Sequence, residues 1–187
     1  MVVDHTCAIG IFPTKNFSTT GEYEPVDKLG VEAQMTRNVG FEACYGCPVG
    51  CSQIKLAQKE PYTGILSEGP EFETMFSYGG ATGVENIDAV IAADRLADEF
   101  GLDTISSGVT IAFAMELYEK GILSKEDTGG IELNFGNDEA MIAILKQMAY
   151  REGLGGLLAD GSKIAAEKIG KDSEKYAMHV KGLELPA

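Results

Sequence analysis

Three of the four cysteines stand close together, at Cys44, Cys47 and Cys51, with the spacing Cx2Cx3C. Clustered thiolates are typical ligands of iron–sulfur clusters, and a [4Fe–4S] cluster usually has four of them. The glycines and the proline between these cysteines permit the tight turn that would bring three sulfurs to three corners of a cubane. A disulfide framework would instead spread its cysteines along the chain. The spacing therefore favours a cluster site.

The residues alone leave two other interpretations of this motif open. A structural zinc ion needs four Cys or His ligands, usually as two pairs. The chain has no second pair, so Cys7, His5 or His179 would have to complete such a set. The third interpretation is three buried free thiols. For a cluster, the fourth ligand is either Cys7 or a residue outside this chain.

Two acidic motifs hold further candidates. In GPEFET, Glu71 and Glu73 would share one face of an extended segment. A carboxylate held near a metal can exchange a proton during the oxidation of a carbonyl compound. In DEFGLDT, Asp98 falls in the last turn of an expected helix, where its charge opposes the helix dipole and suggests a ligand-binding role. The simpler interpretation makes Asp103 a helix N-cap and leaves the other carboxylates solvated.

The elements that must position these groups are mainly helical. Apolar residues recur at helical spacing over about 86–100, 103–120, 137–151 and 157–169, with a shorter stretch over 26–38. A small β-hairpin is expected between Ser52 and Leu66, around the turn EPYTG, and Gly69-Pro70 should end it. The predicted fold class is mainly α: a single helical domain over residues 1–187 with a small β-hairpin near the cysteine motif.

The composition narrows the set of possible binding partners and cellular locations. The net charge of −14 disfavours nucleic acids and anionic membrane surfaces, which are themselves polyanions. No apolar run reaches the roughly 20 residues that a membrane span needs. The first residues lack the basic start and long apolar stretch of a signal peptide. We therefore expect no nucleic-acid or membrane partner and a cytoplasmic protein.

Taken in order, several segments resemble the aldehyde:ferredoxin oxidoreductase family. They are IFPTKNF near the start, CYGCPVGC, GPEFET, DEFGLDTISSG, IAFAMELYEKGIL and the final HVKGLELPA, so the resemblance covers nearly the whole chain. It implies the cluster- and pterin-contacting middle domain of a larger catalytic subunit. The N-terminal β domain and the C-terminal helical domain of that subunit would lie outside this chain.

The resemblance also implies roles for the cofactor-binding residues. Cys44, Cys47 and Cys51 match three ligands of a [4Fe–4S] cluster whose fourth cysteine lies in the family's last domain. Asp98 and Asp103 match a motif that contacts one of two pterins, and these pterins hold a tungsten or molybdenum atom. Carboxylates suit that contact because they accept hydrogen bonds from the N–H groups of an aminopyrimidine ring.

For catalysis, the resemblance points to Glu73 as the glutamate near the metal, with Glu71 as the alternative. The whole subunit would oxidise an aldehyde to a carboxylic acid and pass electrons through the cluster to ferredoxin, whereas the isolated chain should be inactive. The assembly is left open, a homodimer being one option. The rival hypothesis is a stand-alone helical module that uses its thiols as a zinc or redox-sensing site.

Overall fold

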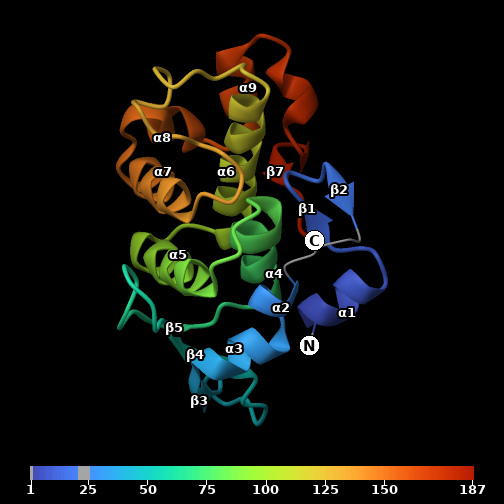
Figure 1. The fold of residues 1–187 in the computed structure, drawn as a ribbon, viewed down its shortest axis with the longest axis vertical. Helices are drawn as coiled ribbons and strands as arrows, with labels where there is room; N and C mark the ends of the chain where they lie inside the picture. Colours follow the sequence, from blue (N-terminus) through green and yellow to red (C-terminus); the bar gives the residue numbers. More distant parts are fainter. Residues whose placement is uncertain (1, 21–25) are drawn as a thin grey trace.

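The computed structural model describes residues 2–20 and 26–187 and is mainly α-helical, as expected (Figure 1). Its helices are α1 Val2–Ala8, α2 Val26–Leu29, α3 Val31–Arg37, α4 Phe72–Met75, α5 Ile87–Phe100, α6 Thr104–Glu119, α7 Asp138–Tyr150, α8 Gly153–Leu158 and α9 Ser162–Ile169, with a π-helical segment η1 Phe76–Ala81 and a 3-10 turn η2 Ser173–Tyr176. The strands are β1 Pro13–Thr14, β2 Thr19–Thr20, β3 Asn38–Glu42, β4 Ser52–Leu56, β5 Leu66–Glu68, β6 His179–Val180 and β7 Leu183–Glu184.

Helix α6 forms the centre of the molecule. Every residue from Ser107 to Leu117 is buried, because η1, α4, α7, α9 and β7 all pack against it. A helix that is apolar on all sides needs such a complete enclosure. Helices α4, α7 and α9 lie around α6, and the small sheet β3–β5 lies at the opposite end of the molecule from α9 (Figure 1).

The expected α5–turn–α6 unit is confirmed, and its ends follow from local signals. The side chain of Asn86 accepts a hydrogen bond from the backbone N–H of Asp88 and so caps the start of α5. Gly101 ends α5 with a φ of 66°, in the left-handed region that glycine adopts at little cost. Asp103 then caps α6, with its Oδ2 2.7 Å from the backbone nitrogen of Ser106.

The single helix expected over 26–38 is wrong in extent. Gly30 interrupts it, so that α2 ends before this glycine and α3 begins after it. Gly30 has no side chain to cap α3, and the carboxylate of Asp4 on α1 takes over, accepting the backbone N–H of Val31 at 3.0 Å. A Cβ at Gly30 would collide with that carboxylate. The stretch ends at Arg37, and Asn38 already belongs to strand β3.

The helix expected over 157–169 is likewise two helices, α8 and α9, which Gly161 separates. Gly161 provides no cap for α9. Glu184 from strand β7 accepts hydrogen bonds from the backbone nitrogen of Ser162 at 2.7 Å and from its hydroxyl at 2.8 Å. Glu184 is 5% exposed, and a Cβ on Gly161 would lie 2.9 Å from its Oε1. As at α3, a carboxylate that is distant in the sequence therefore caps the first turn of a helix that lacks a local cap.

The predicted hairpin is confirmed and extended. Strands β4 and β5 pair antiparallel, with Leu56 opposite Leu66. A third strand, β3, which the sequence analysis missed, pairs antiparallel with the other edge of β4 and gives the order β3-β4-β5. Because Glu42 pairs with Ser52, residues 43–51 become the loop of a hairpin. This segment, called the cysteine loop below, carries all three clustered cysteines.

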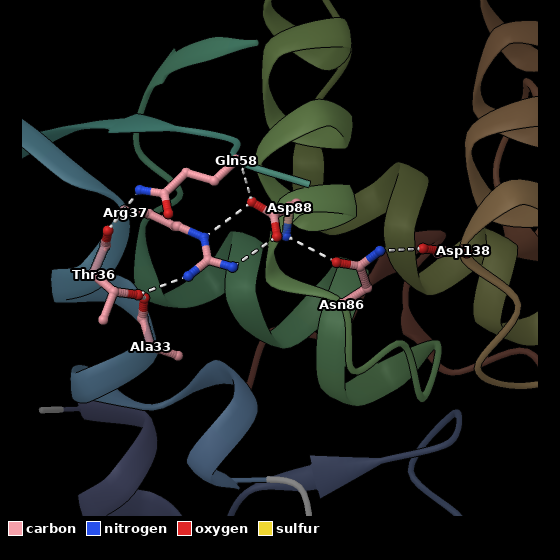
Figure 2. Close-up of polar contacts among 7 residues, drawn as sticks. All are labelled: Ala33, Thr36, Arg37, Gln58, Asn86, Asp88 and Asp138. Carbon is pink, nitrogen blue, oxygen red and sulfur yellow. Dashed lines mark hydrogen bonds and ion pairs between the residues drawn. The ribbon is translucent and has the colours of Figure 1, made fainter. Parts of the chain in front are cut away.

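A partly buried polar network attaches α3, and through it β3, to the helices (Figure 2). The guanidinium of Arg37 contacts both carboxylate oxygens of Asp88 on α5, at 3.0 and 2.8 Å. Asp88 also accepts the backbone N–H of Gln58 at 2.7 Å. Asn86 extends the network to Asp138 on α7 at 2.6 Å. These contacts hold the base of the cysteine-bearing sheet against the helical body.

None of the helices in the described ranges, 2–20 and 26–187, is both long and apolar enough to cross a bilayer.

Candidate functional site

The cysteine loop holds its three thiols at the surface. Cys44, Cys47 and Cys51 are all exposed, and none of them forms a disulfide. The backbone N–H of Cys47 donates to the carbonyl of Cys44 at 2.9 Å, and Gly46 between them has a φ of 74°. The N–H of Cys51 donates to the carbonyl of Val49 at 2.9 Å. The loop is thus a pair of tight turns with its sulfurs accessible to a ligand.

The thiols are not gathered into a finished metal site. Within residues 2–20 and 26–187, no three or more His, Cys, Asp or Glu side chains are arranged to hold a metal ion. Cys7, the rival fourth ligand, lies on α1 and is half-buried. Burial, together with the charge of Asp4, raises the pKa of the Cys7 thiol, which disfavours the thiolate that a metal needs. The ligand roles of Cys44, Cys47 and Cys51 stay a prediction.

The expectation that GPEFET is extended is wrong. Glu71 is the N-cap residue of α4 and Glu73 lies in its first turn, since the N–H of Met75 already bonds to the Glu71 carbonyl. The two carboxylates therefore do not share the face of a strand. Glu73 is half-buried, and its Oε2 accepts the backbone N–H of Ala187 at 3.0 Å. Its position at the start of a helix suits a negative charge.

Asp98 and Asp103 lie on either side of Gly101, as the sequence indicates. Both are exposed. Asp98 is in the last turn of α5, where the helix dipole disfavours its charge. Asp103 uses one carboxylate oxygen to cap α6, which confirms the N-cap interpretation. An ionised carboxylate retains further acceptor sites beyond that single bond.

Sequence analysis missed two buried charged residues, Asp94 and Lys55. Asp94, one turn before Asp98 on α5, is 5% exposed and accepts the hydroxyl of Ser67 at 2.6 Å. Burial raises the pKa of Asp94 to about 6, and the negative charges of Asp98 and Glu71 act in the same direction. Lys55 on β4 is 1% exposed, and burial lowers its pKa while the neighbouring carboxylates oppose that change. A lysine within the apolar strand sequence IKL was the only local signal for this pair.

A cavity of about 340 Å³ brings several of these groups together. Cys51 of the cysteine loop, Lys55 of β4 and Glu71 of the α4 cap all line it, with Gln53 between them. The Oε1 atom of Gln53 is buried and has no hydrogen-bond partner within the described part of the chain. A buried acceptor without a donor is costly, so this wall of the cavity is suited to a group that donates a hydrogen bond.

A second cavity of about 850 Å³ lies between α5, α7 and the β4–β5 connection. Apolar side chains such as Ile65, Leu96 and Ile142 line most of it, and none of the predicted site residues reaches it. Its size alone does not make it the functional site, because of the two cavities only the smaller one is lined by candidate residues, namely Cys51 and Glu71.

Known proteins resemble this chain throughout its length. The family model described as "Aldehyde ferredoxin oxidoreductase, domains 2 & 3" matches residues 1–187. The tungsten-containing aldehyde ferredoxin oxidoreductase of Thermococcus kodakarensis is 41% identical over 180 residues, which cover 95% of this chain and 29% of that protein. The aliphatic sulfonate oxidoreductase, WOR-like subunit, of Pyrococcus furiosus is 42% identical over 151 residues, 79% of this chain and 24% of that protein.

Among solved structures, the active site complex BamBC of benzoyl coenzyme A reductase, in complex with 1,5-dienoyl-CoA, has a similar fold. The TM-score is 0.77 with 28% sequence identity, over 97% of this chain and 27% of that one. The fold and the site thus define a segment of an oxidoreductase. The chain belongs to the aldehyde ferredoxin oxidoreductase family, and it spans less than a third of the length of the relatives that it matches.

Proposed function

We propose that this chain is the cluster-bearing middle domain of a tungsten-dependent subunit that oxidises an aldehyde to a carboxylic acid and passes the electrons to ferredoxin in the cytoplasm. The observation that supports this most is the cavity shared by Cys51, Lys55 and Glu71, since it joins the cysteine loop to the start of the helix that carries Glu73. The remainder of the active site would come from parts of the subunit outside these 187 residues.

The donor chemistry of this chain fits the proposed cofactors. Three exposed thiols in a loop of tight turns suit a [4Fe–4S] cluster that takes its fourth ligand from another domain. The exposed carboxylates of Asp98 and Asp103 would accept the N–H groups of a pterin at the α5–α6 turn. When bound, the tungsten-pterin group and the cluster supply the electron chemistry, and the protein supplies position and electrostatics.

Glu73 would be the proton-transferring residue. Its carboxylate lies on the first turn of α4, half-buried, with Oε2 held by the backbone N–H of Ala187. A fixed carboxylate that is partly shielded from water can take a proton at its second oxygen as a carbonyl substrate is oxidised. Glu71 is less suited to this step because it is exposed and begins the helix.

Cluster assembly in the larger subunit tests the proposal. Prepared without oxygen, that subunit should contain iron and sulfide, and Cys44→Ser, Cys47→Ser and Cys51→Ser should each remove the cluster absorbance. Cys7→Ser is the matched control and should retain it. One zinc per chain in place of iron would favour the thiol-module hypothesis. A cluster lost in Cys7→Ser would show that the fourth ligand had been assigned wrongly.

Turnover provides the second test. The larger subunit should reduce a viologen dye with an aldehyde as donor, and Glu73→Gln should lower kcat by about a hundredfold or more, within the usual range for a general acid–base group. The isolated 187-residue chain should show no turnover. Aldehyde oxidation by the isolated chain would refute the proposal that the rest of the subunit is required.

A further inference from the structure

Two threonine hydroxyls connect the segments that carry the proposed functional carboxylates. Thr74 directly follows Glu73, and Thr104 directly follows Asp103. Their Oγ1 atoms are 2.9 Å apart, across the contact between α4 and α6. Thr74 is 4% exposed, so the bond is largely shielded from water. The two motifs are thus joined by a hydrogen bond one residue away from each carboxylate.

A second connection lies one helical turn deeper. The hydroxyl of Ser107 donates to the carbonyl of Asp103 at 2.6 Å and is also bonded to the hydroxyl of Tyr78 on η1. Because a serine hydroxyl has one proton, Tyr78 must be the donor in their shared bond. Burial raises the pKa of Tyr78 well above its usual range, and nearby carboxylates add to the rise, so Tyr78 keeps its proton. The direction of this hydrogen-bond chain is therefore fixed.

Close packing next to these two connections further restricts how α6 and η1 can move against each other. A Cβ placed on Gly108 of α6 would lie 2.6 Å from the Cβ of Ser77 on η1. The backbones of α6 and η1 consequently approach more closely than any larger residue at position 108 would allow. Both segments are buried at this level, so α6 and η1 behave as one rigid unit.

Helix α4 continues directly into η1, so its Met75 end is held by the contact between η1 and α6, whereas Glu73 lies in the first turn of this helical segment. The first turn of a helix has backbone N–H groups without intrahelical partners, so its position relies more on tertiary contacts. The Thr74–Thr104 bond and the bond from the Ala187 N–H to the Glu73 carboxylate are two such contacts.

Resting on the proposed function, we propose that Thr74 and Thr104 are a positioning pair, which sets the placement of the proton-transferring Glu73 relative to the pterin-contacting Asp103. Neither hydroxyl is required to touch the substrate. A valine at either position would keep the shape and remove the bond, so that the first turn of α4, which carries Glu73, could shift against α6. The pair thus acts through Glu73, and its loss should affect turnover more than substrate binding.

The first test needs neither cofactor nor substrate. In the 187-residue chain, the NMR signal of the Ala187 amide reports its contact with Glu73, and Glu73→Gln identifies the shift that the carboxylate charge causes. Thr74→Val and Thr104→Val should each move this signal, and the double variant should move it no further. Thr128→Val, which removes a buried threonine hydroxyl from the loop between α6 and α7, is the matched control and should leave it in place.

The second test uses the cofactor-loaded larger subunit. Thr74→Val and Thr104→Val should each lower kcat about tenfold or more, as expected for a displaced catalytic group, with KM and metal content nearly unchanged. Thr128→Val should lose comparable thermal stability and retain kcat. An unmoved Ala187 signal in both pair variants would overturn the inference, as would kcat losses equal to that of Thr128→Val. A subunit that oxidises no aldehyde would refute the proposed function alone, since the amide signal still decides the positioning role.

Discussion

Replacing Asp94 with asparagine removes the buried charge beneath the candidate site while keeping an acceptor for the Ser67 hydroxyl. Burial raises the pKa of Asp94 from 3.8 to about 6, so the folded chain binds this proton more tightly than the unfolded chain. Stability therefore falls as the pH rises from about 4 to about 6, because the unfolded state releases the proton first. A difference of about two pH units corresponds to about 3 kcal/mol.

The free energy of unfolding should thus be up to about 3 kcal/mol higher in Asp94→Asn than in the wild-type chain at pH 8, with nearly equal values at pH 4. Urea titrations followed by circular dichroism at several pH values measure both quantities. Glu167→Gln, which removes an exposed charge on α9, is the control and should retain the wild-type pH dependence. The reasoning fails if Asp94→Asn and wild type lose stability in parallel between pH 4 and 6, or if the variant is the less stable at pH 8.

The remaining predictions concern the helix caps and the ion pair between Arg37 and Asp88. Asp103→Ala should lower stability by about 1 kcal/mol, because it removes the α6 cap, whereas Asp98→Ala should leave it equal or slightly higher by relieving the conflict with the α5 dipole. Equal thermal destabilisation by both would contradict this assignment. Arg37→Met should cost about 3 kcal/mol in urea unfolding, because it leaves the Asp88 carboxylate buried without its counter-charge; an unchanged midpoint would refute that role. Glu184→Ala should speed amide hydrogen exchange at the start of α9, while unaltered protection there would show that another group caps the helix.

Acid should also weaken the Arg37–Asp88 contact. Although burial opposes it, the hydrogen bonds from Arg37 and Gln58 keep the pKa of Asp88 below its ordinary value of 3.8. A lowered pKa of this kind contributes stability above about pH 4, and that contribution is lost as the pH falls further. The pH dependence of Asp88 thus has the opposite sign to that of Asp94, which allows the two to be separated.

Local signals allowed the α5–α6 unit to be predicted closely. The cap at Asn86, the left-handed Gly101 and the cap at Asp103 are each interactions within a few residues, so the sequence contains all of their partners. The β4–β5 hairpin follows from similar local evidence. Strand β3 was missed because its pairing with β4 spans the whole cysteine loop and its residues are largely exposed.

The two misjudged helices show where local evidence ends. Gly30 and Gly161 interrupt otherwise helical patterns, and the groups that begin the next helices are Asp4 and Glu184. These carboxylates lie on other elements, so no pattern within the helical windows contains them. Whether a glycine bends, caps or merely weakens a helix is decided by the element that packs against it.

By itself, the sequence determined the mainly helical class, the family and the residue types available for chemistry, because each rests on local order and composition. Only the tertiary structure decided how those residues meet. It placed Glu73 in the first turn of a helix, brought Cys51, Lys55 and Glu71 to one cavity, and buried the carboxylate of Asp94. Burial and the contact of distant side chains are consequences of packing, and they set the pKa values and hydrogen bonds that the proposed chemistry would use.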